Sequence, residues 1–133
     1  MNATKKYRRF LILMLVAVMV IPVLAATAYA SPRYAYNFNF GGGRTSVTGT
    51  KTDYGYSAGV SVLQSNLNGG CVRFQLFGSR GETLSPESEK VWGYTSSCPV
   101  YYYEDCVFNG NRSITMRGNS YGGAISVSGN FVP

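Results

Sequence analysis

The segment Tyr34-Ala35-Tyr36-Asn37-Phe38-Asn39-Phe40 decides the fold class of this chain. Each even-numbered position is aromatic, and an Asn occupies positions 37 and 39 between the aromatic residues. Successive side chains of a β-strand point to opposite faces, so the pattern predicts a strand with one buried face and one face in water. A helix would require apolar residues three and four positions apart, and the segment lacks that spacing.

The same alternation recurs along the chain between turns rich in Gly and Asn. The clearer strand candidates are Val60–Val62, Val72–Leu76, Ile114–Arg117 and Ile125–Ser128, and the weaker ones are Arg44–Thr48, Lys90–Thr95 and Val100–Glu104. The turn candidates, whose Asn and Gly accept the positive φ of tight hairpins, are Gly41–Gly43, Asn68–Gly70, Asn109–Asn111 and Asn119–Gly123. One helical turn is predicted at Ser85–Glu89, since Ser85 can cap it and Pro86 suits its first position. The chain is therefore expected to be all-β, a small antiparallel β-sandwich or barrel of about six to eight short strands.

Residues 1–30 have the layout of a secretory signal peptide, which would form a helix ahead of the β-domain. Four cations precede the apolar run Phe10–Ala26, and the segment ends with Ala28-Tyr29-Ala30. We expect cleavage after Ala30, with Ala28 as the second choice. An uncleaved anchor is the alternative, but Pro22 and the small terminal residues favour cleavage. Residues 31–133 are then a single secreted, extracellular domain that meets the membrane only through its signal peptide.

This predicted domain is nearly neutral. The whole chain has a formal charge of +6, but residues 31–133 hold eight Lys and Arg against six Asp and Glu, a net +2. No cluster of Lys and Arg remains to neutralise phosphates, so nucleic acid is excluded as a partner class.

The residues that usually carry catalysis are missing. The chain contains no His, which removes the commonest general base and metal ligand together with the usual Ser and Cys triads. The carboxylate pairs Glu87/Glu89 and Glu104/Asp105 are too close in sequence to face each other across a cleft, as glycoside hydrolysis requires. Three Cys alone do not complete a zinc site. We therefore expect no catalytic residues, no metal and no cofactor, and a protein that is not an enzyme.

Cys71, Cys98 and Cys106 are an odd number of cysteines for an exported protein. Three pairings are possible, and closeness along the chain favours a Cys98–Cys106 disulfide. Cys71 would then be free, or would link two molecules into a dimer.

The Cys98–Cys106 bond would close a loop, Pro99–Asp105, that carries three adjacent Tyr. Tyr offers contact area at a low entropic cost, so Tyr101, Tyr102 and Tyr103 form a candidate binding surface. In the alternative, Val100–Glu104 is a strand with Tyr101 and Tyr103 on one face and Tyr102 on the other, and the disulfide is then less favourable.

Both ends of the domain resemble a family of small exported proteins of Gram-positive bacteria whose function is unknown. The similar parts are the opening Tyr36–Phe40 and the closing hairpin, Ile114–Asn119 followed by Ile125–Pro133. The resemblance implies a secreted β-fold and no known activity.

Together these patterns indicate a secreted, non-catalytic binding or interaction module that uses exposed Tyr and Arg. Its partner is not determined by the sequence, and a cell-wall glycan and another protein are both compatible with it. The alternative is a bacteriocin-like antimicrobial protein, which the near-neutral charge and the lack of a cationic amphipathic stretch make less favourable.

Overall fold

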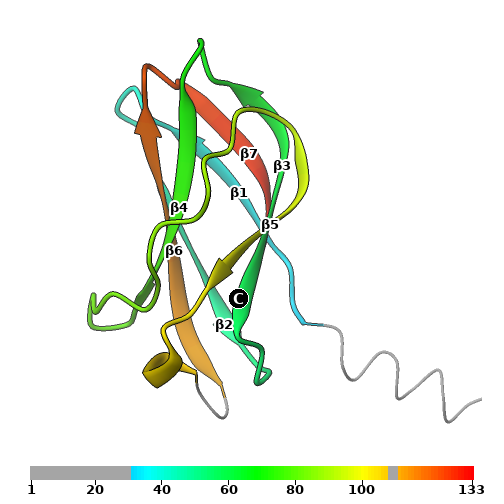
Figure 1. Ribbon diagram of the computed structural model, residues 1–133, viewed down its shortest axis with the longest axis vertical. Helices are drawn as coiled ribbons and strands as arrows, with labels where there is room; N and C mark the ends of the chain where they lie inside the picture. Colours follow the sequence, from blue (N-terminus) through cyan, green and yellow to red (C-terminus); the bar gives the residue numbers. More distant parts are fainter. Residues whose placement is uncertain (1–30, 108–110) are drawn as a thin grey trace, which may run out of the picture. The chain divides into compact units, whose positions relative to one another are not determined.

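The computed structural model describes residues 31–107 and 111–133, and the predicted signal peptide with its cleavage residues, Ala28 and Ala30, lies outside them. Ser31–Pro133 forms one compact unit. Its seven strands are β1 (Tyr34–Asn39), β2 (Ser46–Lys51), β3 (Ser57–Asn66), β4 (Cys71–Gly78), β5 (Thr95–Tyr101), β6 (Arg112–Tyr121) and β7 (Ser126–Val132) (Figure 1). A short 3₁₀ helix, η1 (Glu104–Cys106), follows β5.

The strands form two antiparallel sheets in a sandwich-like arrangement. Sheet A has the order β1-β7-β3-β5, and sheet B has the order β2-β6-β4. The prediction of an all-β domain is confirmed, and the seven strands fall within the expected number. In the described ranges, no helix has the length and apolar character needed to cross a membrane.

The core lies between the inner faces of the two sheets and follows the alternation seen in the sequence. In β1, Phe38 is fully buried and Tyr36 almost so, while Asn37 and Asn39 face water. The Tyr36 ring contacts Phe74 of sheet B with ring centroids 5.9 Å apart. The other fully buried side chains from both sheets include Val60, Val62, Leu76, Ile114, Met116, Val127 and Phe131. Both sheets therefore contribute to one core.

The predicted turn at Asn68–Gly70 joins β3 to β4. Asn68 and Gly69 adopt φ values of 45° and 80°, and the Gly70 N–H donates to the Leu67 carbonyl at 2.6 Å. Two successive positive φ values match the twist of the flanking strands, so this hairpin confirms the interpretation of the Asn-Gly pair.

The predicted helical turn at Ser85–Glu89 is wrong. This segment runs extended along the outer edge of β4, where the Leu84 and Ser88 N–H groups donate to the Leu76 and Phe74 carbonyls. The Ser85 and Ser88 hydroxyls accept hydrogen bonds from the backbone N–H groups of Leu76 and Phe74, both at 2.9 Å. Pairing with β4 thus replaces helical bonding, and it covers an edge that would otherwise expose unpaired backbone groups.

Strand β5 is an edge strand of sheet A and contains a β-bulge. Val60 of β3 pairs with Cys98, but Val62 pairs with Thr95, so β5 holds one residue more than β3 between these pairs. The extra residue lies in the Ser96–Ser97 segment. Pro99 is compatible with this strand because an edge position does not require its missing N–H.

Candidate functional site

The outer face of sheet A carries short, uncharged, hydrogen-bonding side chains in cross-strand rows. Asn37, Ser128 and Gln64 form one row, because Ser128 pairs with Asn37 on one side and with Gln64 on the other. Asn130 and Ser61 form the next row. In β1 and β7 these residues occupy outward positions between buried ones, so the alternation that builds the core also builds this face. Gln64 instead follows a register shift in β3, in a stretch where its neighbours are exposed as well.

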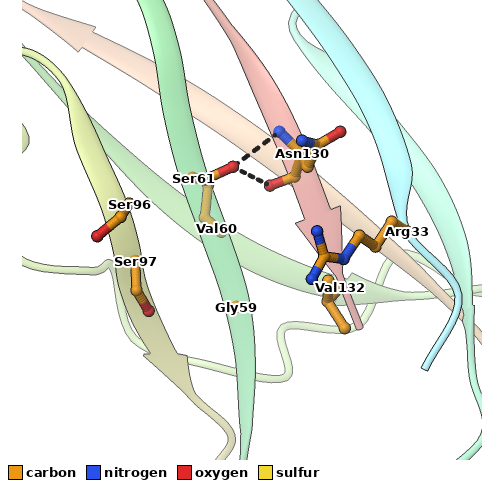
Figure 2. Close-up of a pocket in the computed structure, with 8 residues that line it drawn as sticks. All are labelled: Arg33, Gly59, Val60, Ser61, Ser96, Ser97, Asn130 and Val132. Carbon is orange, nitrogen blue, oxygen red and sulfur yellow. Dashed lines mark hydrogen bonds between the residues drawn. The ribbon is translucent and has the colours of Figure 1, made fainter. Parts of the chain in front are cut away.

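A groove with a volume of about 190 Å³, here called the Arg33 groove, lies on this face (Figure 2). Its polar lining residues are Arg33, Ser61, Ser96, Ser97 and Asn130, and its other lining residues are Gly59, Val60 and Val132. Figure 2 shows the Arg33 side chain extending beside Val132 of β7, with Ser96 and Ser97 on the far side of β3.

The hollow exists because Gly59 has no side chain. Gly59 pairs with Val132 on one side and with Pro99 on the other, at an outward position of β3. A Cβ atom at Gly59 would approach only the Val132 Cβ, at 3.9 Å, which is ordinary van der Waals contact. The backbone here therefore tolerates a side chain, and that side chain would occupy the groove.

The β5 bulge brings two hydroxyl groups to the same face. Consecutive strand residues normally point to opposite faces, but Ser96 and Ser97 are both exposed and both line the groove. Bulges commonly re-aim side chains in this way. Across the groove, the Ser61 hydroxyl accepts from the Asn130 N–H at 3.2 Å and donates to the Asn130 carbonyl at 3.5 Å.

Among the described residues that line the Arg33 groove, Arg33 supplies the only charge. Its side chain is exposed, and it forms no ion pair with any residue in the described part of the chain. No carboxylate or thiol from the described part of the chain lines the groove. The groove can therefore bind an anionic or hydroxyl-bearing group, but it offers no general base.

Two further hollows lie close to the Arg33 groove. One, with a volume of about 340 Å³ and here called the Gln64 hollow, is on the outer face of sheet A and is lined by Asn37, Gln64, Ser65, Asn66, Ser126, Val127 and Ser128. The other, also of about 340 Å³, is lined by residues 89–95 and by Ser97, Cys98 and Pro99 of β5. It includes the exposed rings of Trp92 and Tyr94, and the Lys90 ammonium lies 5.8 Å from the centre of the Trp92 ring.

The structure separates the three tyrosines predicted as a binding surface. Tyr101 ends β5 and is 62 % exposed, Tyr103 is 42 % exposed, and Tyr102 between them is only 6 % exposed. The strand interpretation is therefore correct as far as Tyr101, and a rigid loop with all three rings at its tip is not present. Burial raises the pKa of the Tyr102 hydroxyl, with a smaller contribution from Asp53, and this hydroxyl has no hydrogen-bond partner among the described residues.

Tyr102 packs against a buried cation. The Lys51 ammonium is completely buried, lies 4.9 Å from the centre of the Tyr102 ring and donates to Asp53 at 2.7 Å. Burial alone would raise the Asp53 pKa, but hydrogen bonds from Lys51, the Gly55 N–H and the Ser31 hydroxyl outweigh it and lower the pKa from 3.8 to about 2. This cluster ties the chain before β1 to the end of β2.

The predicted Cys98–Cys106 disulfide is absent, and all three cysteines are free thiols. From Cys98, strand β5 continues for three residues, roughly 10 Å at the usual rise, whereas a disulfide needs Cα atoms within about 7 Å. The chain then leads on to η1 rather than back to Cys98 (Figure 1). Burial raises the pKa of both Cys98 and Cys106, which disfavours the reactive thiolates. Cys71 is buried at the start of β4.

None of the four carboxylates considered in the sequence is among the lining residues of the Arg33 groove. Glu87 accepts hydrogen bonds from the Tyr121 hydroxyl at 2.7 Å and from the Asn119 amide at 2.6 Å, and it lies 3.6 Å from Arg73. These contacts, led by that of Tyr121, lower the Glu87 pKa. Glu104 and Asp105 are exposed residues of η1. No group of three or more Asp, Glu and Cys that could hold a metal occurs within residues 31–107 and 111–133.

Sequence patterns did not single out the residues of the Arg33 groove. The Ser and Asn residues at the outward positions of the alternating segments could have predicted that one face of the sheet is polar. The bulge at Ser96–Ser97 and the position of Arg33 depend on strand pairing, which no local pattern specifies.

No protein-family model, no curated protein and no solved structure matches this chain.

Proposed function

We propose that this protein is an exported, non-catalytic binding module of a Gram-positive bacterium, and that the Arg33 groove is its binding surface at the cell wall. The observation that carries the proposal is the hollow over Gly59, which is surrounded by side chains able to hydrogen-bond with a ligand. Binding sites are typically hollows with a few convergent polar groups.

The lining of the groove supports binding rather than catalysis. It combines three Ser hydroxyls, one Asn amide and one guanidinium with Gly59, Val60 and Val132. A hydrolytic reaction would require a group to activate water or a nucleophile, and none of these side chains is a general base at neutral pH.

Export is supported by the sequence of residues 1–30, whose charged start, apolar centre and Ala-Tyr-Ala end suit a cleaved signal peptide. A Gram-positive source is supported by the resemblance of both ends of the domain to small exported proteins of these bacteria. A protein released on the outer side of such a cell meets the wall first, so the wall is the appropriate material for a binding test.

The test compares wild type with Gly59→Leu. The full chain is expressed in a Gram-positive host, and the protein recovered from the medium is sedimented with purified walls of that host. We expect wild type to sediment with the walls and Gly59→Leu to lose at least about tenfold in affinity, since a Leu side chain fills the hollow.

Thr48→Leu is the matched control, because it adds the same side chain to an exposed strand position of sheet B. We expect Thr48→Leu to bind walls as wild type does and both variants to unfold as cooperatively as wild type. Equal sedimentation of wild type and Gly59→Leu would contradict the proposed surface. Absence of wild-type binding, or recovery of the intact 133-residue chain from membranes alone, would contradict the proposed function.

A further inference from the structure

We propose that the Arg33 groove binds a saccharide unit that carries a carboxylate, and that the Gln64 hollow binds the next unit of the same saccharide chain. The inference rests on the proposed function and names the ligand of that site.

The groove recognises its ligand through side chains rather than through a free strand edge. Its centre is β3, which pairs with β7 on one side and with β5 on the other. The backbone groups of β3 are therefore engaged in two ladders, and an extended peptide cannot join the sheet at this position. A ligand must instead match the outward side chains.

These side chains suit the hydroxyl groups of a sugar. The hydroxyls of Ser96 and Ser97 can each donate and accept, and the Asn130 carboxamide offers two donors and an acceptor. The Ser61 hydroxyl already donates to the Asn130 carbonyl and accepts from the Asn130 N–H, which leaves it one lone pair to accept from a ligand. Gly59 and Val132 add a small apolar surface against which the C–H face of a ring can pack. The groove volume of about 190 Å³ is below the roughly 300 Å³ at which pockets for drug-sized ligands begin, so it fits one ring rather than several.

The charge of the groove indicates which group the ligand carries besides its hydroxyls. Arg33 is the only charged residue in the lining, no carboxylate lies beside it in the groove, and no described residue forms an ion pair with it. A guanidinium presents paired N–H donors whose spacing matches the two oxygens of a carboxylate. A sugar acid therefore uses both parts of the groove, its hydroxyls on the Ser and Asn side chains and its carboxylate on Arg33.

The Gln64 hollow continues the same face without any charge. Ser128, which lines it, is two residues from Asn130 on β7, or roughly 7 Å along the strand. Its polar side chains are amides and hydroxyls, including those of Asn37 and Gln64. A polymer in which an acidic unit is followed by a neutral one matches this order of a charged groove and an uncharged hollow.

The test uses two sugars that differ in one group. N-acetylmuramic acid carries a lactyl carboxylate that N-acetylglucosamine lacks, and each is titrated into the ¹⁵N-labelled protein recovered from the medium, followed by amide chemical shifts. We expect shifts centred on Gly59, Ser61 and Asn130 with both sugars, and an affinity at least about fivefold higher for N-acetylmuramic acid. Lactate alone should cause no comparable shifts, since it cannot contact the Ser and Asn side chains together.

Arg33→Gln should reduce the affinity for N-acetylmuramic acid to that for N-acetylglucosamine and leave the latter unchanged. Arg33→Lys should restore part of the difference, because it retains the charge without the paired donors. Arg44→Gln, at an exposed position of the turn between β1 and β2, is the matched control and should behave as wild type.

Different results would contradict the proposed binding surface and the proposed carboxylated saccharide. If walls bind wild type but not Gly59→Leu, while the two sugars bind equally or Arg33→Gln changes nothing, the binding surface stands and the carboxylated ligand is wrong. Equal shifts with lactate would show that the ring contributes nothing and would also overturn the saccharide. If neither walls nor sugars bind wild type, both proposals are wrong.

Discussion

At the scale of single residues, Lys51 carries a free-energy cost, because its charged side chain is buried completely. Removing a charge from water is expensive unless a partner compensates for it. Asp53 is that partner, at 2.7 Å, although its own side chain is 48 % exposed. The two residues of the pair therefore differ in burial, and substitutions of Lys51 and of Asp53 should change the free energy of unfolding by different amounts.

Asp53→Asn is expected to lower the free energy of unfolding by about 2 kcal/mol at pH 7, because it leaves the buried Lys51 charge without its carboxylate partner. This loss is smaller than for a fully buried pair, because the Asp53 carboxylate is half exposed and water screens its charge. Lys51→Met removes the buried charge itself and should cost less than Asp53→Asn. Urea denaturation of both variants measures the difference. A larger loss for Lys51→Met would contradict this interpretation of the pair.

The same pair predicts a pH dependence. The folded-state pKa of Asp53 is lowered from 3.8 to about 2, so its stabilising contribution is complete above the unfolded pKa and is lost as the pH falls through the folded pKa. The stability difference between wild type and Asp53→Asn should be constant near neutral pH and should shrink between about pH 4 and pH 2. A difference that does not change over this range would show that Asp53 does not titrate as described.

At the scale of elements, the segment beside β4 shows how side chains complete a sheet edge. Ser88 is buried, and its hydroxyl accepts from the Phe74 N–H at 2.9 Å. Ser88→Ala should destabilise the domain by about 1–3 kcal/mol, because a buried N–H loses its partner. Ser96→Ala, at an exposed position of β5, is the control and should change stability by less than about 0.5 kcal/mol. Thermal unfolding of the two variants compares them, and equal melting temperatures would contradict the prediction.

Elements with alternating residues were predictable, and elements whose structure depends on a partner were not. Tyr34–Phe40 and Ile114–Arg117 carry the period of two that a half-buried strand requires. The first segment forms β1 except for Phe40, which follows it, and the second lies within β6. Ser85–Glu89 has good local helix signals, but the unpaired edge of β4 offers its backbone a better set of hydrogen bonds. The Arg33 groove was not predicted for the same reason, since it is assembled from β3, β5, β7 and the chain before β1.

At the scale of the whole domain, the two sheets share one core and are expected to unfold together. Phe38 of sheet A is fully buried and lies against Gly118 of sheet B, where a Cβ atom would come within 2.6 Å of the Phe38 ring. Phe38→Ala should lower the free energy of unfolding by about 3–5 kcal/mol, a large part of the stability of a domain of this size.

Phe38→Leu keeps most of the buried volume and is the matched control, with a smaller loss. Both variants should retain a single transition when they are followed by tyrosine fluorescence and by far-ultraviolet circular dichroism. Two separate transitions in Phe38→Ala would contradict a shared core.

The bulge in β5 affects which side chains the outer face of sheet A can present. An added residue at Ser96–Ser97 places a second hydroxyl on the outer face, while Cys98 and Val100 after it still point into the core. Deletion of one of these two Ser is expected to remove a hydroxyl from the outer face and to restore regular pairing with β3, with Cys98 and Val100 still directed into the core. If the Arg33 groove binds a ligand, the number of residues in this strand, as well as their identity, decides which hydroxyls that ligand meets.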